Sequence, residues 1–314
     1  MASNSPGRSE RNGISMFALQ KMFPTEESAR IWFESVFWPN GRVCPRCGSL
    51  RTHEAGHRHM PYRCSDCRSY FSVKTGTLME ESRLPLLKWV YALYLELTSL
   101  KGISSMRLHR EIEVSQKSAW FMLHRIRAGL LPKNAELFND EVEIDETYIG
   151  GKRKNMSNKK RKELAGTGRG SVGKVAVVGV KERSTRQVRA MVVPDAKKTT
   201  LLPFIKQHVG DGTQVYTDDS KSYLNIPYPH EVVKHSVGEY VRKKAHTNGI
   251  ESFWTVIKKA YHGTYHWFSA KHMERYVQQY VAKHNLRDLD TLDIMESVVR
   301  GMNGRRLKYE ELVS

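Results

Sequence analysis

The amino-acid sequence predicts a multidomain α/β protein, in which a small cysteine-rich module and a helical region precede a mixed β-sheet domain flanked by helices. Three observations predict this organisation. All four cysteines lie between positions 44 and 67. Apolar residues recur at helical spacing from Leu84 to about Leu131, and they change to a strand-like pattern after Pro132. A chain of 314 residues has room for about two domains and small modules.

The charge of the chain narrows the class of partner. Lysine and arginine number 51 against 33 aspartate and glutamate residues, for a formal charge of +18 and a pI near 9.7. Such a surface favours binding to nucleic acid over the alternative of a merely basic soluble protein. No run reaches the roughly 18 apolar residues that a spanning helix needs, and the first residues lack an apolar signal core. We therefore expect a cytoplasmic, nucleoid-associated protein.

The cysteines form two CxxC pairs, CPRC and CSDC, with sixteen residues between them. This spacing is typical of a tetrahedral thiolate site, so Cys44, Cys47, Cys64 and Cys67 are predicted to hold one structural Zn²⁺. Disulfides are the alternative, and a reducing cytosol opposes them. The predicted zinc ribbon occupies residues 42–80.

Residues 1–41 are predicted to form an N-terminal tail and a short helix. The first 15 or so are polar and expected to be disordered. The helix should extend from Glu26 to Phe37, because Pro24-Thr25 is a start signal and WPNG at 38–41 is a stop signal.

Residues 81–131 are predicted to be a helical DNA-binding region of three segments, separated at 99–102 and 113–114. In the third segment Ser115 is a candidate N-cap. Its expected apolar face contains Ala119, Met122, Leu123 and Ile126. The opposite stripe contains Lys117, Trp120, His124 and Arg127. The pattern fits a helix-turn-helix whose last helix presents this stripe to a DNA groove, and a plain helical connector is the alternative.

Residues 132–290 read as a mixed sheet with helices. The expected strands are 142–149, 175–182, 186–194, 213–218 and 231–236, and the expected helices are 196–209, 219–224 and 246–261. This order is that of the ribonuclease H-like fold. In that fold the first and fourth strands are neighbours, which would bring Asp145 close to Asp218.

A strongly basic segment, residues 150–171, separates the first two strands. It is expected to clamp the DNA backbone, and a mobile solvated loop is the alternative. Its candidate DNA-binding residues are Lys152, Arg153, Lys154, Lys159, Lys160, Arg161 and Lys162.

Three carboxylates carry the candidate chemistry: Asp145, Asp218 and Glu251. Hard oxygen ligands from separate elements suit Mg²⁺ or Mn²⁺, and a pair of such ions suits attack on a phosphodiester. Alternation along the first strand places Glu146 on the opposite face with Ile144, so we do not expect it to bind metal.

The helix that carries Glu251 has two faces. The face expected to pack on the sheet contains Ile250, Trp254, Ile257 and Tyr261. The adjacent face contains Asn248, Glu251, Thr255, Lys258 and His262. Glu251 and Lys258 should lie about 10 Å apart along the helix axis. An ordinary charged surface stripe is the alternative for this helix taken alone.

Together these motifs resemble bacterial insertion-sequence transposases with an N-terminal zinc ribbon and a DDE catalytic domain. The matching segments span roughly residues 20–290, from WPNGRVCPRCGS to KHMERYVQQYVAKHNLR, and they leave 291–314 as a C-terminal extension. The resemblance implies that Asp145, Asp218 and Glu251 bind two Mg²⁺ or Mn²⁺ ions. It also implies that Lys258 contacts the transposon end near the cleaved phosphate, with Asn248 supporting the metal site.

The leading hypothesis is a transposase that binds the terminal inverted repeats of an insertion sequence. It would cleave at the element ends by metal-assisted hydrolysis and join the freed 3′-hydroxyl to target DNA. By resemblance, we expect a homodimer or larger assembly on DNA. The alternatives are a ribonuclease H-like nuclease without strand transfer and a transposase-derived DNA-binding regulator.

Overall fold

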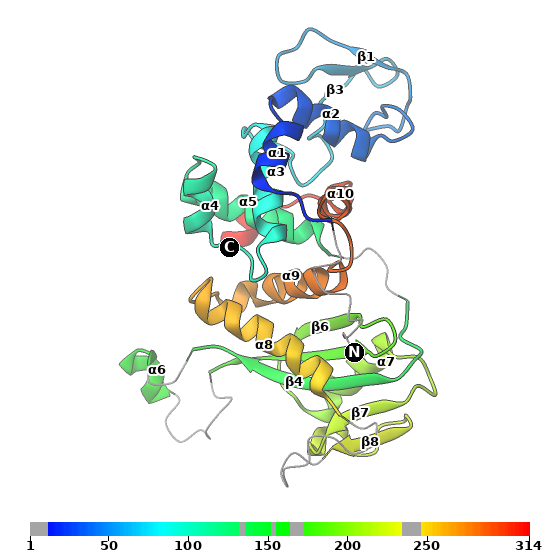
Figure 1. The fold of residues 1–314 in the computed structure, drawn as a ribbon, viewed down its shortest axis with the longest axis vertical. Coiled ribbons are helices and arrows are strands. Elements are labelled where there is room, and N and C mark those ends of the chain that lie inside the picture. Colours follow the sequence, from blue (N-terminus) through cyan, green and yellow to red (C-terminus); the bar gives the residue numbers. More distant parts are fainter. Residues whose placement is uncertain (1–11, 132–135, 152–154, 164–172, 234–245) are drawn as a thin grey trace. The chain divides into compact units, whose positions relative to one another are not determined.

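The computed structural model describes residues 12–131, 136–151, 155–163, 173–233 and 246–314 (Figure 1). The chain forms two compact units. Unit 1 contains residues 1–133 and 286–314, and unit 2 contains residues 134–285. The C-terminal segment that the sequence suggested as an extension therefore belongs to the same unit as the cysteine module.

The cysteine module is a three-stranded antiparallel sheet in the order β1-β2-β3. Its strands are β1 (Thr52–Glu54), β2 (Tyr62–Cys64) and β3 (Tyr70–Phe71). The buried cluster of this module contains Cys44, Tyr62, Cys64 and Phe71, with Trp38 packed against it. So few apolar side chains supply little hydrophobic stabilisation, which is why a ribbon of this size depends on metal.

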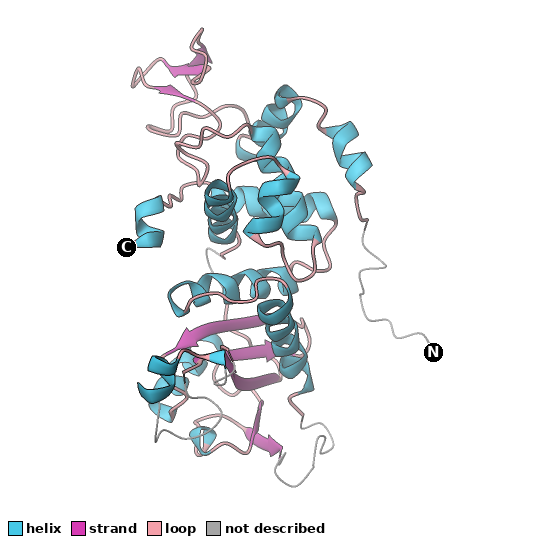
Figure 2. Cartoon of the chain, turned by 90° about the vertical axis from the view of Figure 1, so that its left-hand side faces the viewer, coloured by secondary structure: helices cyan, strands magenta, loops and turns pink. Residues whose placement is uncertain are grey.

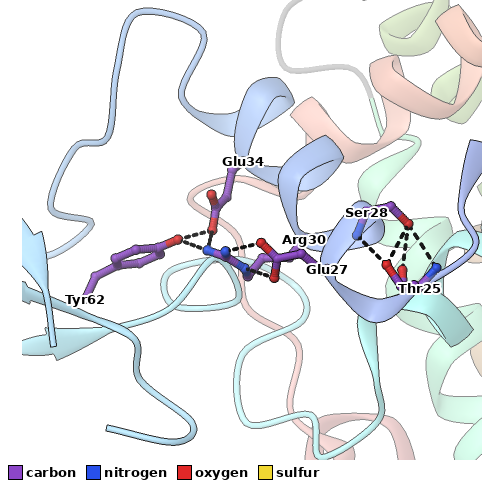
Figure 3. Close-up of polar contacts among 6 residues, drawn as sticks. All are labelled: Thr25, Glu27, Ser28, Arg30, Glu34 and Tyr62. Carbon is purple, nitrogen blue, oxygen red and sulfur yellow. Dashed lines mark hydrogen bonds and ion pairs between the residues drawn. The ribbon is translucent and has the colours of Figure 1, made fainter. Parts of the chain in front are cut away.

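A helix anchors this module through a polar network (Figure 3). Helix α2 (Glu26–Phe37) is the predicted one, and Thr25 caps it by accepting from Ser28 N. Tyr62 donates its hydroxyl hydrogen to Glu34, and Arg30 bridges both Tyr62 and Glu34. Burial and the neighbouring Glu34 carboxylate raise the pKa of Tyr62 to about 12, so its hydroxyl stays a donor at neutral pH.

The beginning of the chain is more ordered than expected from position 12 onward. Asn12 donates its backbone N–H to Asp290 Oδ1 at 2.6 Å, and Ser15 caps helix α1 (Met16–Met22). The predicted disorder of residues 1–11 lies outside the described residues. Helix α1 was not predicted, and only Leu19 in it is buried.

The predicted helical segments are confirmed as α3 (Leu86–Thr98), α4 (Ser105–Glu111) and α5 (Gln116–Gly129), with Ser115 as the N-cap of α5. Two C-terminal helices, α10 (Thr291–Met302) and α11 (Tyr309–Val313), complete unit 1. Helices α5 and α10 approach closely: a Cβ on Gly301 would lie 2.0 Å from the carbonyl oxygen of Gly129. Glycine at position 301 is therefore required for this packing.

Unit 2 contains a five-stranded sheet in the order β6-β5-β4-β7-β8. The strands are β4 (Val142–Ile149), β5 (Val175–Glu182), β6 (Val188–Val193), β7 (Val215–Asp218) and β8 (His230–Val233). The β4-β5 and β5-β6 pairs are antiparallel, whereas β4-β7 and β7-β8 are parallel. This topology confirms the predicted order of strands and is compatible with a ribonuclease H-like domain.

Helices cover both faces of this sheet (Figures 1 and 2). Helices α8 (Asn248–Gly263) and α9 (Met273–Asn285) pack on one face, after a short 3-10 turn η4 (Ala270–His272). Helix α7 (Lys198–His208) and the 3-10 turn η2 (Lys221–Tyr223) lie on the other. The predicted sheet-facing residues of α8, Ile250, Trp254, Ile257 and Tyr261, are all buried.

No helix among the described residues is long and apolar enough to cross a membrane.

Candidate active site and zinc centre

The four cysteine sulfurs meet at one point of the ribbon. All four lie within 4.8 Å of one another, with Cys44 Sγ 3.7 Å from Cys67 Sγ and Cys47 Sγ 3.6 Å from Cys64 Sγ. A tetrahedral site with Zn–S bonds of about 2.3 Å requires sulfur–sulfur distances of about 3.8 Å. The geometry therefore fits one Zn²⁺ and not a disulfide, whose sulfurs would lie about 2 Å apart.

Matching backbone turns deliver the two cysteine pairs. In each pair the first cysteine donates its N–H to the carbonyl oxygen five residues later, at 2.9 Å for Cys44 and 3.0 Å for Cys64. The residue after each pair has a positive φ, +78° at Gly48 and +59° at Arg68. The local sequence CxxC-Gly therefore encodes the first turn, while the second tolerates a non-glycine residue in the left-handed region.

In unit 2, the register of two strands aligns two of the three candidate carboxylates. Strands β4 and β7 pair in parallel, with Val142 opposite Val215 and Glu143 opposite Tyr216. Asp145 and Asp218 each lie two residues beyond the last paired position, so the same register, continued by two residues, would bring them opposite one another. Neighbouring strands lie about 4.8 Å apart, so this register brings the two aspartates close together. Trp254 on α8 contacts Asp145, so they lie on the face that carries α8.

The Asp145 carboxylate is held by a residue that the sequence did not reveal as part of the site. Trp254 on α8 donates its indole N–H to Asp145 Oδ2 at 3.0 Å. Gly179 pairs with Asp145 across β4 and β5, and a Cβ there would lie 2.6 Å from the Trp254 ring. A glycine in the middle of a strand therefore creates the space in which Trp254 reaches the aspartate, and that glycine was the available sequence signal.

The carboxylates interact electrostatically. Burial, followed by the neighbouring negative charges of Glu146, Asp218 and Glu251, raises the pKa of Asp145 from 3.8 to about 7. Like charges close together disfavour ionisation, so the raised pKa of Asp145 indicates that Asp218 and Glu251 are near enough to act on it. Their oxygens are not gathered as tightly as the sulfurs. Among the described residues, only the cysteines form a set of three or more such ligand atoms within 4.8 Å.

Glu251 lies in the first turn of α8, where Thr247 donates its hydroxyl hydrogen to Glu251 Oε1 at 2.7 Å. Along the same helix Asn248 and Lys258 are exposed, while Glu251 is half-buried. The predicted second face of α8 is therefore accessible from solvent. The assignments of these residues to metal and DNA stay predictions.

A buried glutamate fixes the beginning of α8 to the sheet. Glu143, two residues before Asp145 and on the same face of β4, is 2% exposed. Its carboxylate accepts from Ile250 N at 3.0 Å and forms an ion pair with Arg183 at 3.1 Å, and one of its oxygens lies 3.2 Å from His246 Nδ1. A Cβ on Gly249 would lie 2.7 Å from Glu143 Oε2, which explains the glycine beside Asn248.

Glu143 was missed as a positioning residue because its carboxylate is internal to the fold and outside the metal motif. The signals available were its i−2 spacing from Asp145, which places both on one face, and the glycine at the start of α8. By contrast, Glu146 lies on the opposite face as expected, where its Oε2 accepts from the Tyr223 hydroxyl at 2.5 Å.

The predicted DNA-facing stripe of α5 requires correction. His124 and Arg127 are 0% and 2% exposed, so the prediction that they face a DNA groove is wrong. The reason is that α3 and α10 pack against α5, and the sequence pattern did not reveal that C-terminal helix as a partner. Lys117 is exposed and lies 4.3 Å from the Tyr309 ring, and Trp120 is half-buried beside the same tyrosine. Only the N-terminal end of the stripe reaches the surface.

The basic segment after β4 is described in part. Lys159, Arg161 and Lys162 are exposed on α6 (Asn158–Glu163), a short helix within what was predicted as a loop. Lys160 lies on the same helix. Lys152, Arg153 and Lys154 lie outside the described residues, so their predicted DNA contacts stay predictions.

Comparisons with known proteins identify two family domains in the chain. Residues 138–285 match the family model of the ISXO2-like transposase domain, and residues 24–69 match that of the transposase zinc-ribbon domain. The chain is 28% identical over 251 residues to an uncharacterized protein in transposable element ISH50 of Halobacterium salinarum, covering 76% of this chain and 84% of that protein. It is also 28% identical over 119 residues to an uncharacterized transposase-like protein of Haemophilus influenzae, covering 37% of this chain and 95% of that protein. With a zinc ribbon and an ISXO2-like DDE domain in one chain, this protein belongs to the IS1595-type transposase family.

Proposed function

We propose that this protein is an active DNA transposase that binds the terminal inverted repeats of its element, cleaves there and joins the 3′-hydroxyl to target DNA. The observation that carries the proposal is the electrostatic interaction among the three carboxylates: Asp218 and Glu251 help to raise the pKa of Asp145. Such a concentration of negative charge on the accessible side of α8 suits a divalent cation.

In this proposal Asp145, Asp218 and Glu251 would hold two Mg²⁺ or Mn²⁺ ions. When bound, these ions would supply Lewis-acid stabilisation of the attacking and leaving oxygens. Trp254 orients the Asp145 carboxylate through its 3.0 Å hydrogen bond, and Glu143 fixes the helix turn that carries Glu251. Lys258, seven residues farther along α8, would neutralise a DNA phosphate.

The proposal assigns DNA binding to both units. The ribbon and the exposed end of α5 would contact the terminal repeat, and the basic helix α6 would contact the backbone beside the catalytic carboxylates. Two element ends must be held together for joining, so we propose a homodimer or larger assembly on the DNA. Its place of action would be the nucleoid.

The experiment is strand transfer on a labelled oligonucleotide that carries the element's own terminal repeat, with Mg²⁺ or Mn²⁺. The Glu251→Gln variant should lose metal-dependent cleavage and joining, while its affinity for the repeat in EDTA should remain. Glu231→Gln, a change of an exposed glutamate on β8, is the matched control and should join ends like the wild type.

The outcomes separate the alternatives. Joining by Glu251→Gln at the wild-type rate would contradict the assignment of the third ligand. Cleavage without joining by the wild type would favour a nuclease. Binding without cleavage or joining would favour a DNA-binding regulator.

A further inference from the structure

A cavity of about 760 Å³ opens at the end of α8 that lies away from Glu251. The end of β4, the start of β5, the last turn of α8 and the segment before α9 line it, all within unit 2. Its aromatic and imidazole side chains are Tyr261, His262, His266, Trp267 and Phe268. The volume lies within the range of small-molecule sites, about 300–1,000 Å³, and is ample for a nucleotide.

The lining combines a fixed part and an exposed part. Tyr261 and Phe268 are buried, with ring centroids 4.8 Å apart, and Phe268 stacks on Tyr276 at 4.2 Å. Trp267 is 67% exposed, and its indole has no ring or hydrogen-bond partner within the part of the chain that the structure describes. A large exposed tryptophan beside a preformed cavity indicates a binding surface, because removing its apolar area from water is favourable.

The charge of the cavity favours an anionic or neutral polar occupant. None of the residues that line it is acidic, and His262 and His266 are both exposed. Lys258 precedes His262 by four residues and therefore lies on the same side of α8, about one turn away. If a phosphate of a DNA strand contacted Lys258, the neighbouring nucleotides of that strand would lie at the opening of this cavity.

Distances along α8 define which nucleotides could reach it. Glu251 and His262 are eleven residues apart, or about 16 Å along the axis at 1.5 Å per residue. Stacked DNA advances about 3.4 Å per nucleotide, so the cavity lies within about five nucleotides of a phosphate held at the carboxylates. A base inside a duplex cannot enter such a recess, whereas an extruded base can.

We propose that this aromatic cavity binds one unpaired nucleobase of the DNA strand near the cleaved phosphate, with Trp267 as its stacking surface. The inference rests on the proposed function, because that function places DNA along α8. Burial of an apolar side chain from a second copy of the chain is the competing occupant. Trp267 is the only large exposed hydrophobic residue among the described residues of the lining, and this, together with the nearby Lys258, favours the base.

The test is equilibrium binding of the full-length protein, in EDTA, to fluorescein-labelled duplexes of the terminal sequence that flanks its gene. One duplex is fully paired, and the others each carry a single mismatch at one of the first six positions inside the cleavage site. A mismatched base is extruded more readily, so the wild type should bind one of these duplexes about tenfold more tightly than the paired one. Trp267→Ala should bind both equally, and Trp267→Phe should retain most of the preference.

Two controls isolate the effect. Leu224→Ala removes another exposed apolar side chain of unit 2, 56% exposed, and should keep the mismatch preference. Lys258→Ala should weaken binding to paired and mismatched duplexes by the same factor, since a phosphate contact does not sense base pairing.

Three results would overturn the inference while leaving the proposed function intact. One is a wild-type protein that joins ends yet shows no mismatch preference at any position. Another is a Trp267→Ala variant that keeps the preference. The third is a Trp267→Ala protein whose DNA binding is unchanged but which no longer self-associates in light scattering. That result would assign the cavity to a second copy of the chain. Failure of the wild type to bind any of the duplexes would instead reject the proposed function.

Discussion

The zinc ribbon and the carboxylate site assemble their ligands in opposite ways. The cysteines come from two turns of one small sheet, and their sulfurs lie within 4.8 Å of one another. The carboxylates come from β4, β7 and α8, and Asp145 has its pKa raised to about 7 by burial and by its neighbours. The first site is formed by short-range backbone turns, whereas the second depends on contacts between distant elements that hold like charges together.

This difference teaches where stability comes from in each region. The ribbon has a small buried cluster, so its folding should depend on its metal. Unit 2 has two large apolar layers on either side of its sheet, and it can support a site whose charges are unfavourable to one another. Removing metal ions should therefore unfold the ribbon but leave the sheet of unit 2 folded.

The largest expected effect follows from removing a zinc ligand. Cys64→Ser should unfold the ribbon, because a structural Zn²⁺ contributes on the order of 10 kcal/mol to folding of such a module. Zinc content measured by atomic absorption should fall, and proteolysis should cut within residues 42–80 first. Ser65→Ala, a change at an exposed neighbour, should behave like the wild type. A Cys64→Ser protein with full zinc content and an intact ribbon would break the comparison.

The next effect concerns the contacts that hold the carboxylate site together. Glu143→Ala should lower the free energy of unfolding of unit 2 by about 3–5 kcal/mol, because it removes the buried partner of Arg183 and the acceptor of Ile250 N. The change should also lower activity by displacing the first turn of α8. Urea unfolding followed by tryptophan fluorescence measures the loss.

Glu141→Ala is the matched control for that change. Glu141 pairs with the same Arg183 at 3.2 Å, but its side chain is 31% exposed against 3% for Glu143. An exposed pair contributes less than about 1 kcal/mol, so this variant should be nearly as stable as the wild type. Equal losses in the two variants would contradict the anchoring role of Glu143.

A smaller, pH-dependent effect is expected at Asp145. Its pKa in the folded protein, about 7, exceeds the ordinary value of 3.8, so the folded state binds the proton more tightly than the unfolded state. Stability contributed by the protonated form is therefore lost as pH rises from about 4 to 7. Asp145→Asn does not titrate, and in EDTA it should be more stable than the wild type by on the order of 2 kcal/mol at pH 8.

The same two proteins should differ little at about pH 3, below the ordinary pKa of 3.8, where the wild-type carboxyl is mostly protonated in both states. Thermal unfolding at the two pH values measures this. With Mg²⁺ at pH 8 the order should reverse, because only the wild type gains from binding the ion. A wild type more stable than Asp145→Asn at pH 8 in EDTA would show that the carboxylates do not repel one another.

An effect of similar size should come from Gly179→Ala. The added Cβ would meet the Trp254 ring at 2.6 Å, so the ring must shift and its hydrogen bond to Asp145 should weaken. We expect a loss of about 1–3 kcal/mol in stability and reduced cleavage. Gly263→Ala, where nothing lies within 4 Å of the new Cβ, is the control and should retain both properties.

Local patterns were sufficient for much of the fold. The bounds of α2 agree with the capping signal at Thr25, and the strand order of unit 2 follows from alternation and turn residues. The clustering of the four cysteines was predictable because CxxC spacing encodes its own turn geometry. The three carboxylates were singled out by their places on two strands and at the start of a helix, and the resemblance then implied their roles. The register of β4 and β7 supports the expected closeness of Asp145 and Asp218.

Other features could not be read from local patterns. His124 and Arg127 form a plausible polar stripe on α5, but α3 and α10 cover that helix, and the partner α10 lies more than 160 positions later in the chain. Helix periodicity indicates which residues share a face. It does not indicate what packs against the second face, so burial of charged side chains was missed.

The sequence by itself determined the residue types of the two candidate sites, the order of the elements and the faces on which Asp145, Glu251 and Lys258 lie, because short-range backbone geometry sets the last two of these. Only the tertiary structure decided that Gly179 makes room for Trp254, that Glu143 holds the start of α8, and that a cavity opens beside Trp267. Those features depend on the close packing of side chains from separate elements, where displacements of an ångström decide which groups meet.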